Sequence, residues 1–181
     1  MDEKKYKESL ESLEKHSTDI QIRLGLHSLF SIDNTPADYR ENVDAVGVDY
    51  FGNTYLIQHK HRKGKKDFCF ELEYEKMPTH PVVGSEYRYS LHMGKANYLT
   101  YELDDKLYIF DFRVLSLLYT FKHDSFKEYT VKDKTDKGKE YKHPVCFIEK
   151  EKLLELYRET QENILTRNNF TPYIKEDSEE E

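Results

Sequence analysis

The residues best suited to chemistry are Asp44, Gln58 and Lys60. Asp44 and Gln58 lie in two β-rich segments, residues 43–50 and 54–59, and Lys60 directly follows the second segment. A Phe-Gly-Asn sequence between the segments is typical of a tight turn, so the two segments predict a hairpin. Side chains alternate along a strand, so Gln58 and Lys60 share one face and the hairpin can bring Asp44 beside them. The pattern thus predicts a small polar cluster on one side of a sheet.

This cluster has the groups that metal-dependent hydrolysis of a phosphodiester needs. Mg²⁺ (or Mn²⁺) prefers oxygen ligands, which the Asp44 carboxylate and the Gln58 amide can supply. Lys60 can hold the attacking water or the scissile phosphate with its positive charge. The alternative for Asp44 is a strand-end acid that hydrogen-bonds a turn, and the alternative for Gln58 is an exposed strand residue.

The same residues resemble the PD-(D/E)xK nuclease superfamily, in which an acid on one core strand precedes (D/E)xK on the next. Asp44 takes the first position, Gln58 the Asp/Glu position and Lys60 the lysine position. The Gln-x-Lys variant looks like that of restriction nucleases acting on modified DNA. Residues 94–111 also look like the family's second hairpin, so the resemblance covers roughly residues 17–121.

The resemblance implies an α/β fold of the restriction-endonuclease type, with a mixed central sheet flanked by helices. It also implies a metal-dependent endodeoxyribonuclease with DNA as its partner, often working as a homodimer. The family often has a further acid on the preceding helix, and Asp19 matches best by position, ahead of Asp33 and Glu41. The chain departs from the family pattern in having Val43 before the first acid and a neutral Gln58, which should weaken Mg²⁺ binding.

A basic run follows the Gln-x-Lys sequence, although the net charge of the chain is -7. Arg62, Lys63, Lys65 and Lys66 could grip the phosphate backbone of DNA, or they could form a solvated turn around Gly64. The neutral Gln58 and the overall acidity favour a second reading of the chain. In that reading it is a catalytically inactive nuclease-like module that binds DNA or inhibits a host protein, as a phage accessory protein would.

The remaining sequence predicts a single domain over residues 1–170 and an acidic, disordered tail over residues 171–181. Helical patterns extend from residue 3 to 30, in one or two pieces, and over residues 114–121 and 149–165. Strands are predicted at residues 68–74, 97–103, 106–111 and 145–148, a loop at 77–90, and a solvated excursion at 122–142.

Two isolated cysteines, the absence of a signal peptide and the absence of a long apolar run are typical of a cytoplasmic protein without a membrane span. Histidines near the cluster raise the possibility of a zinc site, but their spacing is not that of zinc ligands. His59 and His61 alternate with Lys60, so we expect them on the opposite face of the strand.

Overall fold

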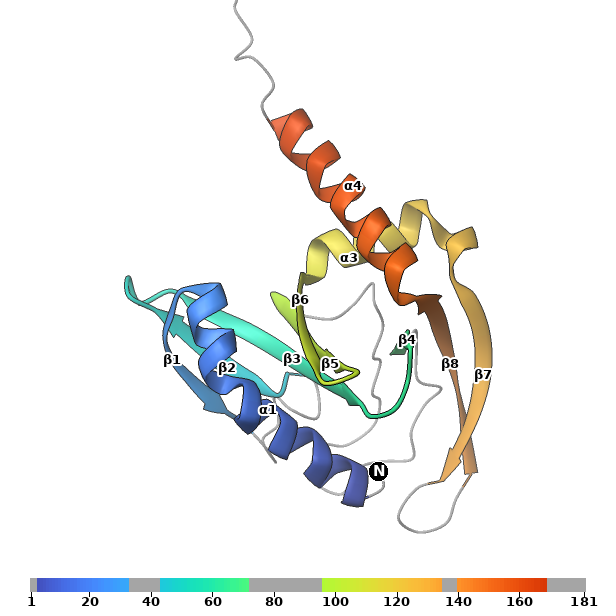
Figure 1. Ribbon diagram of the computed structural model, residues 1–181, viewed down its shortest axis with the longest axis horizontal. Coiled ribbons are helices and arrows are strands. Elements are labelled where there is room, and N and C mark those ends of the chain that lie inside the picture. Colours follow the sequence, from blue (N-terminus) through green and yellow to red (C-terminus); the bar gives the residue numbers. More distant parts are fainter. Residues whose placement is uncertain (1–2, 33–42, 72–95, 135–139, 169–181) are drawn as a thin grey trace, which may run out of the picture.

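The structure, a computed structural model, describes residues 3–32, 43–71, 96–134 and 140–168. It is an α/β structure in which a mixed central sheet is flanked by helices (Figure 1). Its elements in chain order are α1 (Glu3–Leu24), β1 (Leu26–Ser31), β2 (Ala45–Asp49), β3 (Thr54–Arg62), β4 (Asp67–Glu71), β5 (Tyr98–Leu103), β6 (Lys106–Asp111), α3 (Phe112–Phe121), η1 (His123–Ser125), β7 (Lys127–Lys134), β8 (Glu140–Glu149) and α4 (Lys150–Asn168).

The central sheet, here called sheet A, has the strand order β1-β2-β3-β5-β6. Only the β3–β5 pair is parallel, and the other neighbours are antiparallel. Helix α1 lies across one face and buries Leu13 and Ile20 against Leu26, Ala45 and Ile57. Because side chains alternate along each strand, the residues next to these on the strands point to the opposite face.

The opposite face of sheet A packs against a second sheet of three strands, β4-β8-β7, here called sheet B. Phe68 of β4 is fully buried, and its ring meets those of Tyr101, Tyr108 and Phe110 edge-on at centroid distances of 4.9, 5.2 and 5.5 Å. Helices α3 and α4 complete this larger core with residues such as Leu115 and Leu153. Sheet B therefore covers the half of sheet A that contains β5 and β6.

The prediction of helix as far as residue 30 is wrong, because Leu26–Ser31 forms strand β1. Gly25 ends α1 with a φ of +65°, a left-handed conformation that glycine adopts without steric cost. The chain then turns back, and Leu26 packs under α1 while β1 pairs with β2. Gly47 makes this possible, since a Cβ there would lie 2.5 Å from Leu26 Cδ1.

The prediction of a solvated excursion over residues 122–142 is also wrong, because most of it belongs to sheet B. Strand β7 pairs along its whole length with β8, which also contains the strand predicted at residues 145–148. Described side chains of β7 such as Lys127, Glu128 and Lys132 are exposed, which explains why their composition resembles that of a loop.

The other predicted elements are present, and their bounds differ by a few residues. The hairpin of β5 and β6 turns at Asp104 and Asp105, whose φ values of 53° and 57° are those of the type I′ turn that suits a two-residue hairpin. Helix α3 begins at Phe112, slightly before the predicted start at residue 114, and Asp111 caps it by accepting hydrogen bonds from the backbone N–H groups of Arg113 and Val114.

Several predictions concern parts of the chain outside the described residues. These are the loop at residues 77–90, the end of the strand predicted at 68–74, and the tail at 171–181. Within the part of the chain that the structure describes, no helix combines the length and the apolar character needed to cross a bilayer.

Candidate active site

Asp44 lies just before β2 and reaches across to β3. Its Oδ2 accepts a hydrogen bond of 2.6 Å from the backbone N–H of His59, and its own N–H donates to the carbonyl of Ile57 at 2.9 Å. The carboxylate thus accepts from β3 a hydrogen bond that a backbone carbonyl would accept in a regular sheet. This places it at the peptide between Gln58 and His59, with Lys60 next along the strand.

Gln58 and Lys60 lie in the middle of sheet A, because β3 has β2 on one side and β5 on the other. In the parallel register they pair with Leu99 and Tyr101, whose side chains belong to the core under sheet B. Gln58 is 4% exposed, whereas Asp44 and Lys60 are half-buried. The three residues therefore lie at the edge of the area of sheet A that packs against sheet B.

The predicted outer acid, Asp19, is not brought into this cluster. It is exposed on α1, and the buried side of α1, with Ser12, His16 and Ile20, packs on the other face of sheet A. Because Gln58 and Lys60 point away from α1, Asp19 and these two side chains lie on opposite sides of the sheet. Asp33 and Glu41 lie outside the described residues.

The basic run divides into one cation held by the protein and three lysines at the surface. Arg62 Nη1 donates to the carbonyl of Asp67 at 3.1 Å, and its guanidinium lies 5.2 Å from the ring centroid of Phe147. Arg62 thus joins β3 to sheet B. Lys63, Lys65 and Lys66 are exposed around the turn at Gly64, so they remain the better candidates for contacts with a phosphate backbone.

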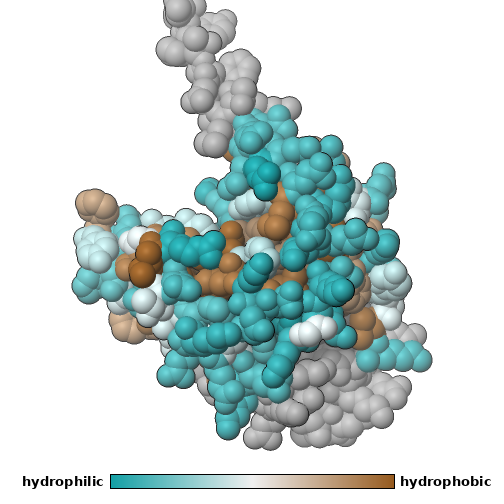
Figure 2. All heavy atoms as spheres, viewed as in Figure 1, coloured by the Kyte–Doolittle hydropathy of each residue, from teal (hydrophilic) through white to brown (hydrophobic). Residues whose placement is uncertain are grey.

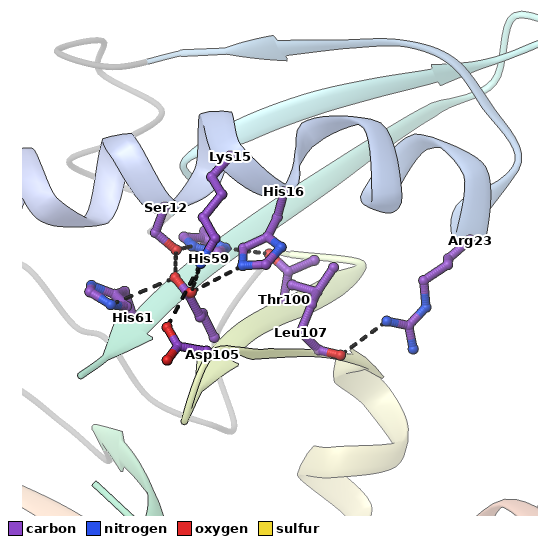
Figure 3. Close-up of polar contacts among 10 residues, drawn as sticks. Ser12, Lys15, His16, Arg23, His59, His61, Thr100, Asp105 and Leu107 are labelled. Carbon is purple, nitrogen blue, oxygen red and sulfur yellow. Dashed lines mark hydrogen bonds and ion pairs between the residues drawn. The ribbon is translucent and has the colours of Figure 1, made fainter. Parts of the chain in front are cut away.

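On the other face of β3 lies a network of buried polar side chains, drawn in Figure 3. Ser12 Oγ lies 2.7 Å from His59 Nε2 and donates to Glu102 Oε2 at 2.5 Å. His59 Nδ1 lies 2.9 Å from Thr100 Oγ1, which donates to the carbonyl of Gln58 at 3.2 Å. The network therefore links α1, β3 and β5 directly beneath the candidate site.

Glu102 is the ionised centre of this network. Burial raises its pKa, but hydrogen bonds from Lys15, Ser12 and His16 outweigh burial and lower the pKa to about 2. The Lys15 ammonium is 2.6 Å from Glu102 Oε1, and His61 Nε2 is 3.6 Å from Oε2. His16 Nε2, which is buried, lies 3.2 Å from Oε1.

His59 is held as a neutral imidazole. Burial lowers its pKa to about 3, and the neighbouring His16 acts in the same direction, while the charge of Glu102 opposes both. A neutral His59 carries one N–H, so one ring nitrogen donates a hydrogen bond and the other accepts one. Either Ser12 or Thr100 then donates its hydroxyl proton to His59, in place of Glu102 or the Gln58 carbonyl respectively.

Sequence reasoning placed the two histidines correctly but missed their partners. The contacts of His59 and His61 confirm that they point to the face opposite Lys60. Ser12, Thr100 and Glu102 were not singled out. A signal for two of them exists, because β5 carries Thr-x-Glu in register with His-x-His of β3, pairing Thr100 with His59 and Glu102 with His61.

No protein-family model, no curated protein and no solved structure matches this chain. Within the described residues, no group of three or more His, Cys, Asp and Glu side chains could hold a metal ion. The pair of Asp44 and Gln58 is a different donor set, with one carboxylate and one amide oxygen. Its oxygen atoms are of the type that Mg²⁺ takes as ligands, and Mg²⁺ commonly keeps several waters beside one or two protein oxygens.

Proposed function

We propose that the chain is a metal-dependent DNA endonuclease of the PD-(D/E)xK type. The observation that carries the proposal is the contact of the Asp44 carboxylate with the β3 backbone beside Gln58 and Lys60. An acid on one strand and a Gln-x-Lys sequence on its antiparallel neighbour resemble the arrangement of this superfamily. The mixed sheet, with β5 parallel to β3 and α1 against one face, is consistent with the fold that the resemblance implies.

Each residue of the cluster has a distinct role in the proposed reaction. Asp44 and Gln58 would hold Mg²⁺ or Mn²⁺, which, when bound, makes a water more nucleophilic and offsets charge on the phosphate. Lys60 would hold the scissile phosphate or the attacking water through its ammonium group. Lys63, Lys65 and Lys66 would bind neighbouring phosphates of the DNA backbone.

A second candidate function is a nuclease-like module that binds DNA or a host protein without cutting. The neutral and buried Gln58 favours it, because the site then has one fewer negative charge to attract a divalent cation. Asp19, on the far side of sheet A, is not placed to supply the missing charge. In this case the Asp44 contact would serve only to hold β2 against β3.

The decisive experiment is cleavage of plasmid and single-stranded DNA with Mg²⁺ or Mn²⁺. Asp44→Asn keeps an oxygen that can accept the His59 N–H but removes the charge, so it tests chemistry more cleanly than Asp44→Ala. We expect Asp44→Asn and Lys60→Ala each to lower the cleavage rate by about 10²-fold or more. The matched controls, Asp124→Asn and Lys122→Ala, change exposed residues beyond α3 and should cut like the wild type.

The Gln58→Glu variant separates the two candidate functions. It restores the carboxylate of the family pattern, and we expect it to lower the Mg²⁺ concentration needed for half-maximal cleavage. If folded wild-type protein cuts no substrate and Gln58→Glu gains no activity, the enzyme proposal is refuted and the binding module takes its place.

A further inference from the structure

The face of sheet A that carries Gln58 continues past the candidate site as an apolar row. The strand register pairs Phe30 of β1 with Val46 of β2, and Val46 with Leu56 of β3. Leu56 and Gln58 are two residues apart on β3, so this row and the candidate site are neighbours on one face. Phe30 is 56% exposed, and Val46 and Leu56 are half-buried. This part of the face, unlike the half under sheet B, is open to solvent at Phe30.

The β2–β3 turn, which lies beyond this row along the two strands, presents two aromatic side chains to solvent. Tyr50 is 75% exposed and Phe51 is 92% exposed. Asp49 holds the turn, because its Oδ1 accepts from the N–H groups of Phe51 and Asn53, both at 2.8 Å, and its Oδ2 accepts from the Asn53 amide. Figure 2 shows hydrophobic residues at this end of the molecule, the left end in the view. The aromatic rings therefore stand on a rigid support.

Cations lie at the other end of the same strand. Lys60 follows the candidate site, and the exposed Lys63, Lys65 and Lys66 follow the end of β3. From Thr54 to Arg62, β3 spans about 26 Å at the usual rise per residue. Along this line the surface changes from cationic, through the candidate site, to apolar and aromatic.

This order of charges and rings fits a polymer with an anionic backbone and flat apolar bases that are free to unstack. In a duplex the base faces are hidden in the stack, so Phe30 and Phe51 would find no partner. In a single strand each base has an accessible face that stacks on an aromatic side chain. A purely apolar protein partner would leave the lysines at the other end of β3 without a role.

We infer that the substrate of the candidate site is single-stranded DNA, or a single-stranded segment beside a duplex. Its phosphates bind to Lys60, Lys63, Lys65 and Lys66, and bases on the other side of the scissile bond stack on Phe30 and Phe51. The inference rests on the proposed function and adds the strandedness of the substrate to it.

Binding of fluorescent oligonucleotides to the full chain tests the inference. Anisotropy is measured with a single-stranded 20-mer and with the matching duplex, in EDTA so that neither is cut. We expect tighter binding of the single strand, and Phe30→Ala and Phe51→Ala should each weaken that binding by about 5- to 150-fold. Both side chains are exposed, so the variants should fold, and circular dichroism checks this. Phe121→Ala, which removes a ring 75% exposed at the end of α3, is the matched control and should bind like the wild type.

The results distinguish failure of the inference from failure of the proposed function. If wild-type protein cuts DNA while Phe30→Ala and Phe51→Ala leave single-strand binding unchanged, the inference is wrong and the nuclease proposal stands. Equal losses on single strand and duplex would also overturn it, because stacking requires exposed bases. If wild-type protein neither binds nor cuts any DNA at low salt, both are refuted.

Discussion

Acidification should destabilise the protein through His59, the buried imidazole next to the candidate site. Its pKa is about 3 in the folded chain, because burial disfavours the charged form, against an ordinary value of 6.5. Between these two pH values the unfolded chain binds more protons at this residue than the folded chain does. The stability that depends on a neutral His59 is therefore complete above about pH 7.5 and is lost as the pH falls through this window.

The size of the effect follows from the two pKa values. Lowering the pH from 8 to 5 should reduce the free energy of unfolding by about 2 kcal/mol through His59 alone. This figure changes little unless the folded pKa rises above about 4, since at pH 5 the folded imidazole then remains mostly neutral. Glu102, whose pKa is lowered to about 2, adds a further loss below its ordinary value of 4.5. The two losses therefore have the same sign.

Urea unfolding at pH 8 and pH 5, followed by circular dichroism in the presence of a chelator, measures the effect. For the wild type, a loss of this size should lower the midpoint by roughly 1 M urea. His59→Gln should be less stable than the wild type at pH 8, yet it should lose about 2 kcal/mol less on acidification. His27→Gln, at an exposed histidine, is the control and should keep the wild-type dependence on pH. If His59→Gln loses as much stability on acidification as the wild type does, a neutral buried His59 is not the source of the effect.

Substitutions at three further positions test the fold by differential scanning calorimetry. Phe68→Ala should cost about 3–5 kcal/mol, since the ring fills the space between the sheets, and an unchanged melting temperature would contradict that packing. Asp111→Ala should cost about 1 kcal/mol by removing the cap of α3, whereas Asp111→Asn should retain most of it. Asp105→Gly should stabilise by up to about 1 kcal/mol, because glycine accepts a φ of 57° without strain; a lower melting temperature would contradict this.

The strands around the candidate site could be predicted because their patterns are local. Residues 43–50 and 54–59 are rich in β-forming residues and enclose a turn, and the structure has β2 and β3 there. The stretch from Leu26 to Ser31 is short, and its apolar residues Leu26, Leu29 and Phe30 have the i, i+3, i+4 spacing that indicates a helix. This stretch becomes a strand because it pairs with β2, whose residues are distant in the sequence. The charged strand β7 was missed for the opposite reason, since it has so little apolar pattern to read.

The neighbourhood of Gln58 and Lys60 could be predicted only in part. Alternation gives the face of each residue on β3, and the contacts of His59 confirm it. Nothing in the sequence shows that Ser12 and Glu102, which are far apart in the chain, meet at that imidazole. Nor does sequence position show that Asp19 lies on the wrong side of the sheet to join Asp44, because that depends on which side of α1 is buried.

Side chains that alternate along β3 belong in turn to the candidate site and to the buried polar network on the other face of the sheet. Odd-numbered residues, His59 and His61, are held by polar contacts to α1 and β5, and even-numbered residues, Gln58 and Lys60, face the candidate site. A slip of β3 by one residue would turn Gln58 and Lys60 toward α1 and break the hydrogen bonds of His59. The same slip would turn Ile57 out of its apolar contacts under α1, so packing and hydrogen bonds favour the same register. Directional hydrogen bonds beneath β3 therefore stabilise the one register in which Asp44, Gln58 and Lys60 share a face.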